Sequence, residues 1–455
     1  MRAKRDVEVV GDQLKNDKGG AFVLASKTFV YKKIRREIEE MTIHDIANGA
    51  PSKGRYTAMV VCWLLGNGVL FPWNSMLTII DYYIYLFPKY HTSRVITLFY
   101  QPFAIGTLAI LTYHEAKINT RIRILFGFSM YFMSILLLLI LDLATSGKGG
   151  IGVYVGICIV SGAFGFADAN AEGGLVGDLS CMESEFIQSF FAGLAASGAI
   201  TSALRLITKA AFENSKNGLR KGAILFFGVS CFYELLCVLL YAFVFPKIPI
   251  VKYYHLKAAS EGSKTVSDDR QTQIVSIEES VKSDPNQLQR LSNKELLLKN
   301  IDYIADIFLI YLLTLSIFPG FLFEYTGKHS LRTWYSLVLV AMFNVWDLIG
   351  RYTPVLKPLN IESRKGLIIA VLSRFLFIPA FYFTAKYGKQ GWMIMLTSLL
   401  GLSNGHLTVC VMTCAPKGYK GPEQNALGNL LVLFLQGGLS AGVTLDWLWL
   451  IGKGW

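Results

Sequence analysis

The sequence is short of charge for its length. Only 17% of its 455 residues are Asp, Glu, Lys or Arg, whereas 53% are hydrophobic. A typical soluble domain has about 25% charged residues. A soluble chain of this size could bury a large core, but it would still need a charged surface, and this sequence cannot provide one. The shortage excludes an ordinary soluble protein and indicates one surrounded by lipid.

Sequence patterns for covalent chemistry and for metal binding are also missing. The seven cysteines form no Cys-x-x-Cys pair and no His-Cys cluster, so no metal site is predicted. No Ser-His-Asp set or phosphate-binding loop stands where it could work. We therefore expect neither an enzyme nor a cofactor.

The positive charge of the chain indicates contact with anionic lipid and not with nucleic acid. The net charge is +12, but Lys and Arg lie mainly between apolar segments, without the interleaved aromatics of a nucleic-acid-binding stripe. The anionic cytoplasmic face of a lipid bilayer is the expected partner, and nucleic acid is not.

Eleven apolar segments are long enough to cross a bilayer, which takes about 20 residues. Helices are expected, because isolated strands cannot satisfy their backbone in lipid. The predicted fold is an all-α polytopic membrane protein with six helices followed by five. The segments cover residues 57–85, 95–113, 124–145, 151–176, 185–208, 222–245, 301–325, 332–352, 366–385, 391–414 and 425–449.

Two polar stretches divide the chain. Residues 1–56 are expected to form a cytosolic tail with a short amphipathic helix near 28–47, and residues 246–300 a mostly disordered cytosolic loop. They delimit a six-helix bundle over 57–245 and a five-helix bundle over 301–455. Two bundles around a central path, with a site at the midplane and alternating access, are how many transporters are built.

The distribution of Lys and Arg predicts the orientation. With the N-terminus in the cytosol, most of these residues fall in cytosolic loops, in agreement with the positive-inside rule. Eleven crossings then leave the C-terminal Trp455 outside, and the plasma membrane is the expected location.

Several predicted membrane segments contain charged side chains, each of which costs about 2.5–3.5 kcal/mol at the centre of a helix. Asp168 and Glu172 are four residues apart and share one helical face. Asn344, Asp347 and Arg351 also share a face. Such faces must look toward a cavity or a partner helix.

Some of these charges have a purely structural interpretation. Arg205 and Arg374 could form interhelical ion pairs that fix the bundle, and Asp347 with Arg351 could do the same. Two charges and an amide on one face, however, exceed what a single ion pair needs, so we favour a binding role for the last pair.

The first segment adds groups that suit an aromatic ligand. Pro72 is followed by the flat ring of Trp73 and the amide of Asn74, although a packing kink with a core Trp remains the alternative. Asp347 and Arg351 balance in charge and could hold hydroxyls. The ligand is then nearly neutral with a flat ring: nucleosides fit, and sugars or aromatic amino acids fit less well.

Three short stretches resemble equilibrative nucleoside transporters. They are residues 72–74 (Pro-Trp-Asn), 343–351 (Phe-Asn-Val-Trp-Asp-Leu-Ile-Gly-Arg) and 403–405 (Ser-Asn-Gly), in the right order and spacing. The stretch 186–212 looks like the plant branch of that family. The resemblance implies eleven helices, a cytosolic N-terminus, a fold related to the major facilitator type and a central site between two halves.

The resemblance also implies which residues contact substrate, with Asp347 and Arg351 on the ribose. Gln101 joins them only because it is a polar residue inside the second segment. The expected substrate-binding residues are Leu70, Trp73, Asn74, Leu77, Gln101, Glu172, Phe318, Asn344, Asp347, Arg351 and Leu439.

Helix four departs from the animal pattern of the family. Glu172 stands where that pattern has a Gln facing the base, and Asp168 lies one turn before it. Desolvation favours the neutral carboxyl. We therefore expect either proton coupling through Asp168 and Glu172, or a passive carrier in which Glu172 stays protonated and imitates an amide.

The predicted function is passage of nucleosides through a membrane, with protons as the second partner if coupling exists. A carrier of another neutral solute, such as a sugar or a nucleobase, is the first alternative. A membrane receptor or scaffold that transports nothing is the second, and the intramembrane charges argue against it.

We predict that Asp347→Ala and Arg351→Ala each abolish uptake while folded protein stays in the membrane. Removing one partner leaves the other charge buried alone, which costs about 3–5 kcal/mol. The double variant should therefore fold no worse than either single one. Uptake and the amount of folded protein are the measurements, and normal transport by both single variants would place the site elsewhere.

Overall fold

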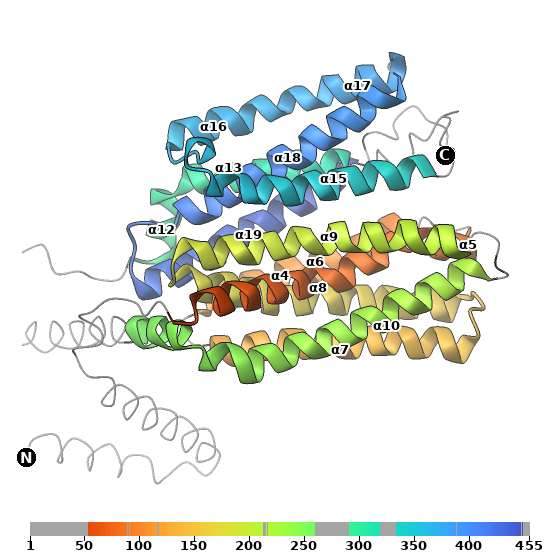
Figure 1. The fold of residues 1–455 in the computed structure, drawn as a ribbon, viewed down its shortest axis with the longest axis horizontal. Helices are drawn as coiled ribbons and strands as arrows, with labels where there is room; N and C mark the ends of the chain where they lie inside the picture. The colour runs from red at the N-terminus through yellow and green to blue at the C-terminus, as the bar shows by residue number, and fades with distance from the viewer. Residues whose placement is uncertain are drawn as a thin grey trace, which may run out of the picture.

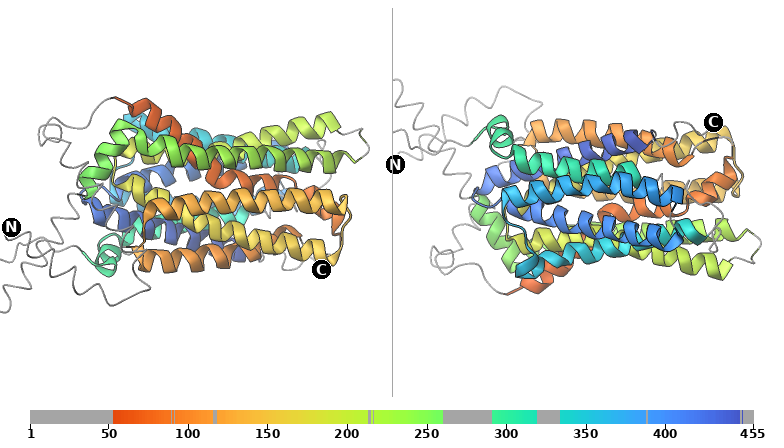
Figure 2. Two further views of the ribbon diagram at one scale, coloured as in Figure 1. Left: turned by 90° about the horizontal axis from the view of Figure 1, so that it is seen from below. Right: turned by 90° about the horizontal axis from the view of Figure 1, so that it is seen from above.

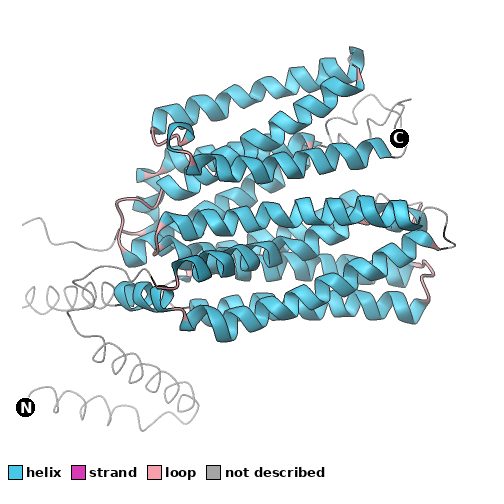
Figure 3. Cartoon of the chain, in the orientation of Figure 1, coloured by secondary structure: helices cyan, strands magenta, loops and turns pink. Residues whose placement is uncertain are grey.

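The computed structural model is built of helices, and no strand occurs among the residues it describes (Figures 1 and 3). The predicted amphipathic helix near 28–47, most of the tail and of the central loop, and Trp455 lie outside these residues. Those described are 53–88, 90, 92–115, 118–212, 215, 217–259, 291–318, 334–387, 389–446 and 448.

The helices follow the predicted segments. The first half contains α4 (Arg55–Thr78), α5 (Ile80–Leu86), α6 (Thr92–Tyr113), α7 (Thr120–Thr145), α8 (Ile151–Ser180), α9 (Ser184–Phe212) and α10 (Gly218–Leu239). The second half contains α12 (Asn293–Lys299), α13 (Ile301–Ile317), α15 (Tyr335–Tyr352), α16 (Arg364–Ser373), α17 (Phe377–Tyr387), α18 (Gln390–Cys414) and α19 (Gly421–Asp446).

Nine helical stretches of the described chain are long and apolar enough to cross a membrane. The all-helical membrane fold is therefore confirmed. α13 and α15 fall outside that set and occupy the two remaining predicted segments. A total of eleven crossings stays a prediction.

Two predicted segments are interrupted. The first breaks at Ile79, between α4 and α5, and not at Pro72, through which α4 continues. Neighbouring helices in a membrane re-satisfy the backbone that a proline frees, so a proline need not end a helix. The segment 366–385 is interrupted by the single 3₁₀ turn η7 (Arg374–Leu376), between α16 and α17.

The ends of the predicted disordered loop are helical. A helix covers 249–259, and α12 begins at Asn293. The hydroxyl of Ser292, the residue before it, forms a capping box with the Glu295 carboxylate. The interior of the loop, 260–290, lies outside the described residues. The two ends of the predicted loop are thus ordered, and the expectation that the loop is mostly disordered stays a prediction.

The helices pack as two halves (Figures 1 and 2). In the first half α4 packs on α9, α6 and α7 pack on α8, and α10 packs on α7 and α4; in the second, α18 packs on α15 and α17, and α13 packs on α18 and α19. The halves meet where α9 contacts α15 and α18, and where α19 contacts α8 and α6. Any relative motion of the halves must occur at these contacts.

Two glycines allow α4 and α9 to approach closely. A Cβ at Gly193 of α9 would overlap the backbone oxygen of Trp63, and a Cβ at Gly66 of α4 would overlap that of Phe190. Backbone atoms cannot rotate away as a side chain can. Small residues at such positions are the usual means of close packing between membrane helices.

We predict that Gly193→Ala destabilises the protein by about 1–3 kcal/mol, the usual cost of overpacking, because α4 and α9 must separate. The matched control is Gly228→Ala in α10, where a Cβ meets nothing within 4 Å. Thermal unfolding of the purified variants measures both. Equal stability of the two would contradict the close-packing account.

Candidate functional site

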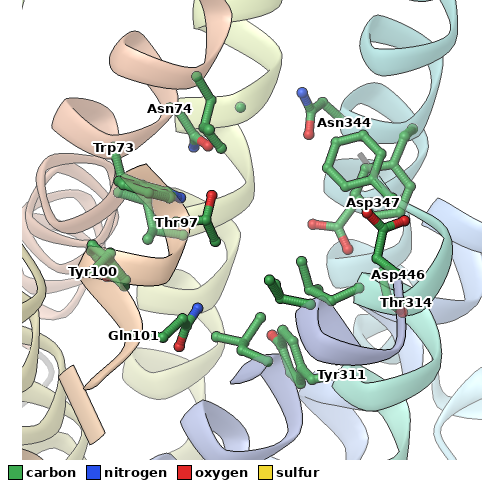
Figure 4. Close-up of a pocket in the computed structure, with 18 of the residues that line it drawn as sticks. Trp73, Asn74, Thr97, Tyr100, Gln101, Tyr311, Thr314, Asn344, Asp347 and Asp446 are labelled. Atoms are coloured by element: carbon green, nitrogen blue, oxygen red, sulfur yellow. The ribbon is translucent and has the colours of Figure 1, made fainter. Parts of the chain in front are cut away.

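A cavity of about 510 Å³ lies between the two halves. One wall comes from α4, α6, α8 and α9, and the other from α13, α15, α18 and α19 (Figure 4). At one end the lining reaches the α5–α6 connection, at Pro88 and Tyr90, and the last residue of α19, Asp446. The cavity thus extends from the centre of the bundle toward one face.

The structure brings every residue of the predicted substrate set to this lining. They come from five different helices and the residue after α13, so the sequence alone did not place them together. The set is Leu70, Trp73, Asn74, Leu77, Gln101, Glu172, Phe318, Asn344, Asp347, Arg351 and Leu439. Asp168 is not on the lining and lies behind it. That these residues bind substrate stays a prediction.

Aromatic side chains form flat surfaces on both walls. The rings of Trp73 and Tyr100 lie 4.2 Å apart between centroids, tilted by 34°. Across the cavity, Phe318 and Phe343 stack at 4.0 Å. Figure 4 shows Trp73 and Tyr100 on the wall opposite Asp347. A planar ligand could therefore lie against either wall.

The charged centre of the cavity is the pair of Asp347 and Arg351 on α15. The Arg351 Nε donates to Asp347 Oδ2 at 3.1 Å, and both side chains are buried. Asn404 Nδ2 donates to the other carboxylate oxygen at 2.7 Å. Arg351 Nη1 also donates to the backbone oxygen of Phe191 on α9 at 2.7 Å. The pair is therefore both part of the lining and a link between the halves.

Two asparagine amides are each held by a single serine. Asn74 Nδ2 donates to Ser197 Oγ at 2.6 Å, and Asn344 Nδ2 donates to Ser202 Oγ at 2.8 Å. Both serines lie on α9. Neither amide oxygen has a hydrogen-bond partner within the described chain. Both remain available as acceptors for a ligand.

The two carboxyls of α8 share one amide donor from the other half. Gln436 Nε2 of α19 lies 2.6 Å from Asp168 Oδ2 and 3.4 Å from Glu172 Oε2. The Tyr131 hydroxyl donates to Asp168 Oδ1 at 3.1 Å. Both carboxyls are buried. Gln436 therefore connects them to a helix of the opposite half.

The ion-pair interpretation holds for one of the two isolated arginines. Arg205 pairs with Asp81 of α5. Arg374 has no carboxylate partner in the described part of the chain, where its hydrogen bonds go to neutral groups, so the interpretation finds no support there. The nearby Asp347 already accepts from Arg351 and Asn404.

Sequence reasoning missed several polar residues that also line the cavity. Asn404 lies in the stretch 403–405 that resembles the family, but it was not included among the expected substrate-binding residues. Gln436 could have been found as an amide within an apolar segment, whereas Thr and Tyr are too common there to give a signal. The missed residues are Thr97, Tyr100, Tyr311, Thr314, Asn404, Gln436 and Asp446.

Contacts between the halves close the opposite end of the bundle, near α12. Arg123 Nη1 of α7 donates to Asn429 Oδ1 of α19 at 2.8 Å. Asn425 Nδ2, also of α19, donates to Glu115 at 3.1 Å. The cavity is thus closed at this end.

A contact beyond the membrane-spanning helices also lies at the closed end. His255, in the helix over 249–259, lies 2.9 Å from Asp178 at the end of α8. Burial alone would lower the pKa of His255, but the charge and the hydrogen bond of Asp178 raise it above its usual value. The helix is thereby attached to the end of α8.

Two helical halves around a central polar cavity define an α-helical membrane transporter with a major facilitator fold. The chain superposes with a TM-score of 0.57, over 88% of each chain and at 12% identity, on the major facilitator superfamily proton:xylose symporter XylE bound to 6-bromo-6-deoxy-D-glucose. At that identity the likeness shows the fold alone.

Sequence comparisons then give the family. The family model described as nucleoside transporter matches residues 157–451. Equilibrative nucleotide transporter 3 of Arabidopsis thaliana is 66% identical over 408 residues, which cover 89% of this chain and 98% of the relative. Equilibrative nucleotide transporter 6 of the same plant is 64% identical, over 88% and 96%. The chain belongs to the plant branch of the equilibrative nucleoside transporter family, and it is a transporter rather than an enzyme.

Proposed function

We propose that the protein moves nucleosides across a membrane by alternating access through the central cavity. The observation that carries this is the ion pair of Asp347 and Arg351 facing the ring of Trp73 across about 510 Å³ of space. That volume lies within the range of about 300–1,000 Å³ usual for small-molecule sites. The sugar hydroxyls would bind the ion pair, and the base would lie against the wall that carries Trp73.

The charges of the lining favour a nucleoside over a nucleotide, although the relatives are named nucleotide transporters. Glu172, Asp347 and Asp446 are acidic, and Arg351 is the one cation among the described lining residues. Its charge is already balanced by Asp347. A phosphate group is bound best by a cation that no carboxylate neutralises, and the described lining offers none.

Uptake by the reconstituted protein tests this proposal. We predict that proteoliposomes accumulate labelled uridine and adenosine, and that uridine monophosphate neither enters nor competes. Transport of a sugar or of uracil in place of nucleosides would identify the other neutral-solute carrier. An absence of any flux would favour the receptor or scaffold.

Alternating access accounts for the asymmetry of the cavity. The contacts of Arg123 with Asn429 and of Glu115 with Asn425 close one end and must break when the halves rock. We assign that end to the cytosol, because the positive-inside rule places the N-terminus there. The C-terminus is then extracellular, and the plasma membrane is the proposed location.

Proton coupling would use Asp168 and Glu172. Two buried carboxyls that share the one amide donor of Gln436 cannot both stay ionised at low cost, so a proton held by the pair is part of the proposal. Gln436 lies on α19 and the carboxyls on α8, in opposite halves. Rocking would separate donor from acceptors and change the affinity of the pair for its proton.

We predict that Glu172→Gln still binds and exchanges nucleoside but no longer responds to a pH gradient, because it cannot release a proton. Uptake at two external pH values measures this, alongside Asp168→Asn. The control is Glu362→Gln, which removes an exposed carboxylate outside the membrane helices. An unchanged response to the gradient in both Glu172→Gln and Asp168→Asn leaves a passive carrier with a permanently protonated Glu172.

A further inference from the structure

Arg374 is a buried cation that neither packing nor the proposed transport cycle explains. It lies in the 3₁₀ turn between α16 and α17, does not line the cavity, and has only 4% of its surface exposed. Within the described chain its partners are neutral. A buried charge without a counter-charge is costly, and in a membrane protein it marks a functional region.

The guanidinium makes three hydrogen bonds to the helices behind the cavity. Nε donates to Ser403 Oγ of α18 at 3.0 Å, Nη1 to the backbone oxygen of Ile310 at 3.1 Å, and Nη2 to Thr314 Oγ1 at 2.8 Å. Ile310 and Thr314 both lie on α13. Arg374 therefore acts at the contact between α13 and α18.

From Thr314 the hydrogen bonds continue to the ion pair. Thr314 Oγ1 lies 2.8 Å from Asn404 Oδ1, and Asn404 Nδ2 lies 2.7 Å from Asp347 Oδ1. Thr314, Asn404 and Asp347 all line the cavity, and Figure 4 shows Thr314 and Asp347 on the same wall. Four side chains on four elements thus form one continuous relay.

Arg374 determines the direction of the hydrogen bonds in this relay, by selecting the acceptor to which the Thr314 hydroxyl donates. The Thr314 hydroxyl has a single proton and two acceptors at 2.8 Å, Asn404 Oδ1 and the Ile310 backbone oxygen. Arg374 donates to that backbone oxygen and to the Thr314 oxygen itself. The Thr314 proton is therefore directed to Asn404.

The direction of the hydrogen bond from Thr314 fixes the orientation of the Asn404 side-chain amide. With Oδ1 held by the Thr314 proton, the amino group points at Asp347. The reverse orientation would place an amide oxygen against a carboxylate oxygen. Asn404 and Arg351 then occupy one oxygen of Asp347 each. The carboxylate is held in one orientation, with its remaining lone pairs available to the cavity.

We propose that Arg374 is a positioning residue that orients Asp347, through Thr314 and Asn404, to accept the ribose hydroxyls of a nucleoside. The proposal rests on nucleoside transport as the function. It assigns to Arg374 a role in discriminating sugars: a misoriented Asp347 weakens binding of uridine, which has both ribose hydroxyls, more than binding of 2′,3′-dideoxyuridine, which has neither.

The test compares KM for uridine and for 2′,3′-dideoxyuridine in proteoliposomes of the full chain. We expect Arg374→Gln to raise KM for uridine about tenfold, the effect of losing one hydrogen bond to a charged group, and to leave KM for dideoxyuridine within about twofold. Arg374→Lys keeps the positive charge but places its donors on a single nitrogen, so it should raise KM for uridine less than Arg374→Gln does.

Thr314 supplies a matched pair that keeps the proposal testable if Arg374→Gln does not fold. Thr314→Val breaks the relay and should reproduce the selective rise in KM, whereas Thr314→Ser keeps the hydroxyl and should match the wild type. The double variant Arg374→Gln/Thr314→Val should be no worse than the more affected single variant, because both interrupt one relay.

A structural role for Arg374 predicts a different result. It would lower the amount and the thermal stability of folded protein and leave the ratio of the two KM values unchanged. An unchanged ratio in folded Arg374→Gln, or identical behaviour of Thr314→Val and Thr314→Ser, overturns the proposal. Failure of the wild type to transport uridine would instead overturn the proposed function.

Discussion

Asp347 and Arg351 form an ion pair at 3.1 Å in the interior of an apolar bundle, where either charge alone would cost several kcal/mol. The pair is tolerated because further hydrogen bonds support both side chains. Asn404 Nδ2 donates to the Asp347 carboxylate, and the backbone oxygen of Phe191 accepts a hydrogen bond from the Arg351 guanidinium. Since Phe191 belongs to α9 and the pair to α15, the same bonds that stabilise the charges hold the two halves together around the cavity.

The two halves contribute different chemistry to the cavity. The second half provides the ion pair and the cationic support of Arg374 behind it. The first half provides the Trp73 and Tyr100 rings and the carboxyl of Glu172, with Asp168 behind the lining, whereas the aromatic surface of the second half is the stack of Phe318 and Phe343. Gln436 and Arg351 reach across between them. A substrate that contacts both halves replaces some of these links, which is how binding could be coupled to rocking of the halves.

The sequence predicted the fold well because the length of an apolar run and the backbone's need for hydrogen bonds in lipid leave few alternatives. It also predicted much of the cavity lining, since an intramembrane polar group such as Glu172 or Asn344 must avoid lipid. It could not predict the break at Ile79 or the partners of Arg374. Those depend on which helices are neighbours, as does Gln436, which lies 264 positions from Glu172 along the chain.

In the proposed binding mode, a nucleoside lies between the rings of Trp73 and Tyr100 and the ion pair of Asp347 and Arg351. A cryo-electron microscopy structure of the full chain with uridine tests this most directly. We predict density for the ribose within hydrogen-bonding distance of Asp347 and Arg351, and density for the uracil ring on the side of Trp73. Density for uridine outside the cavity, or with its ribose directed away from Asp347, would contradict the account.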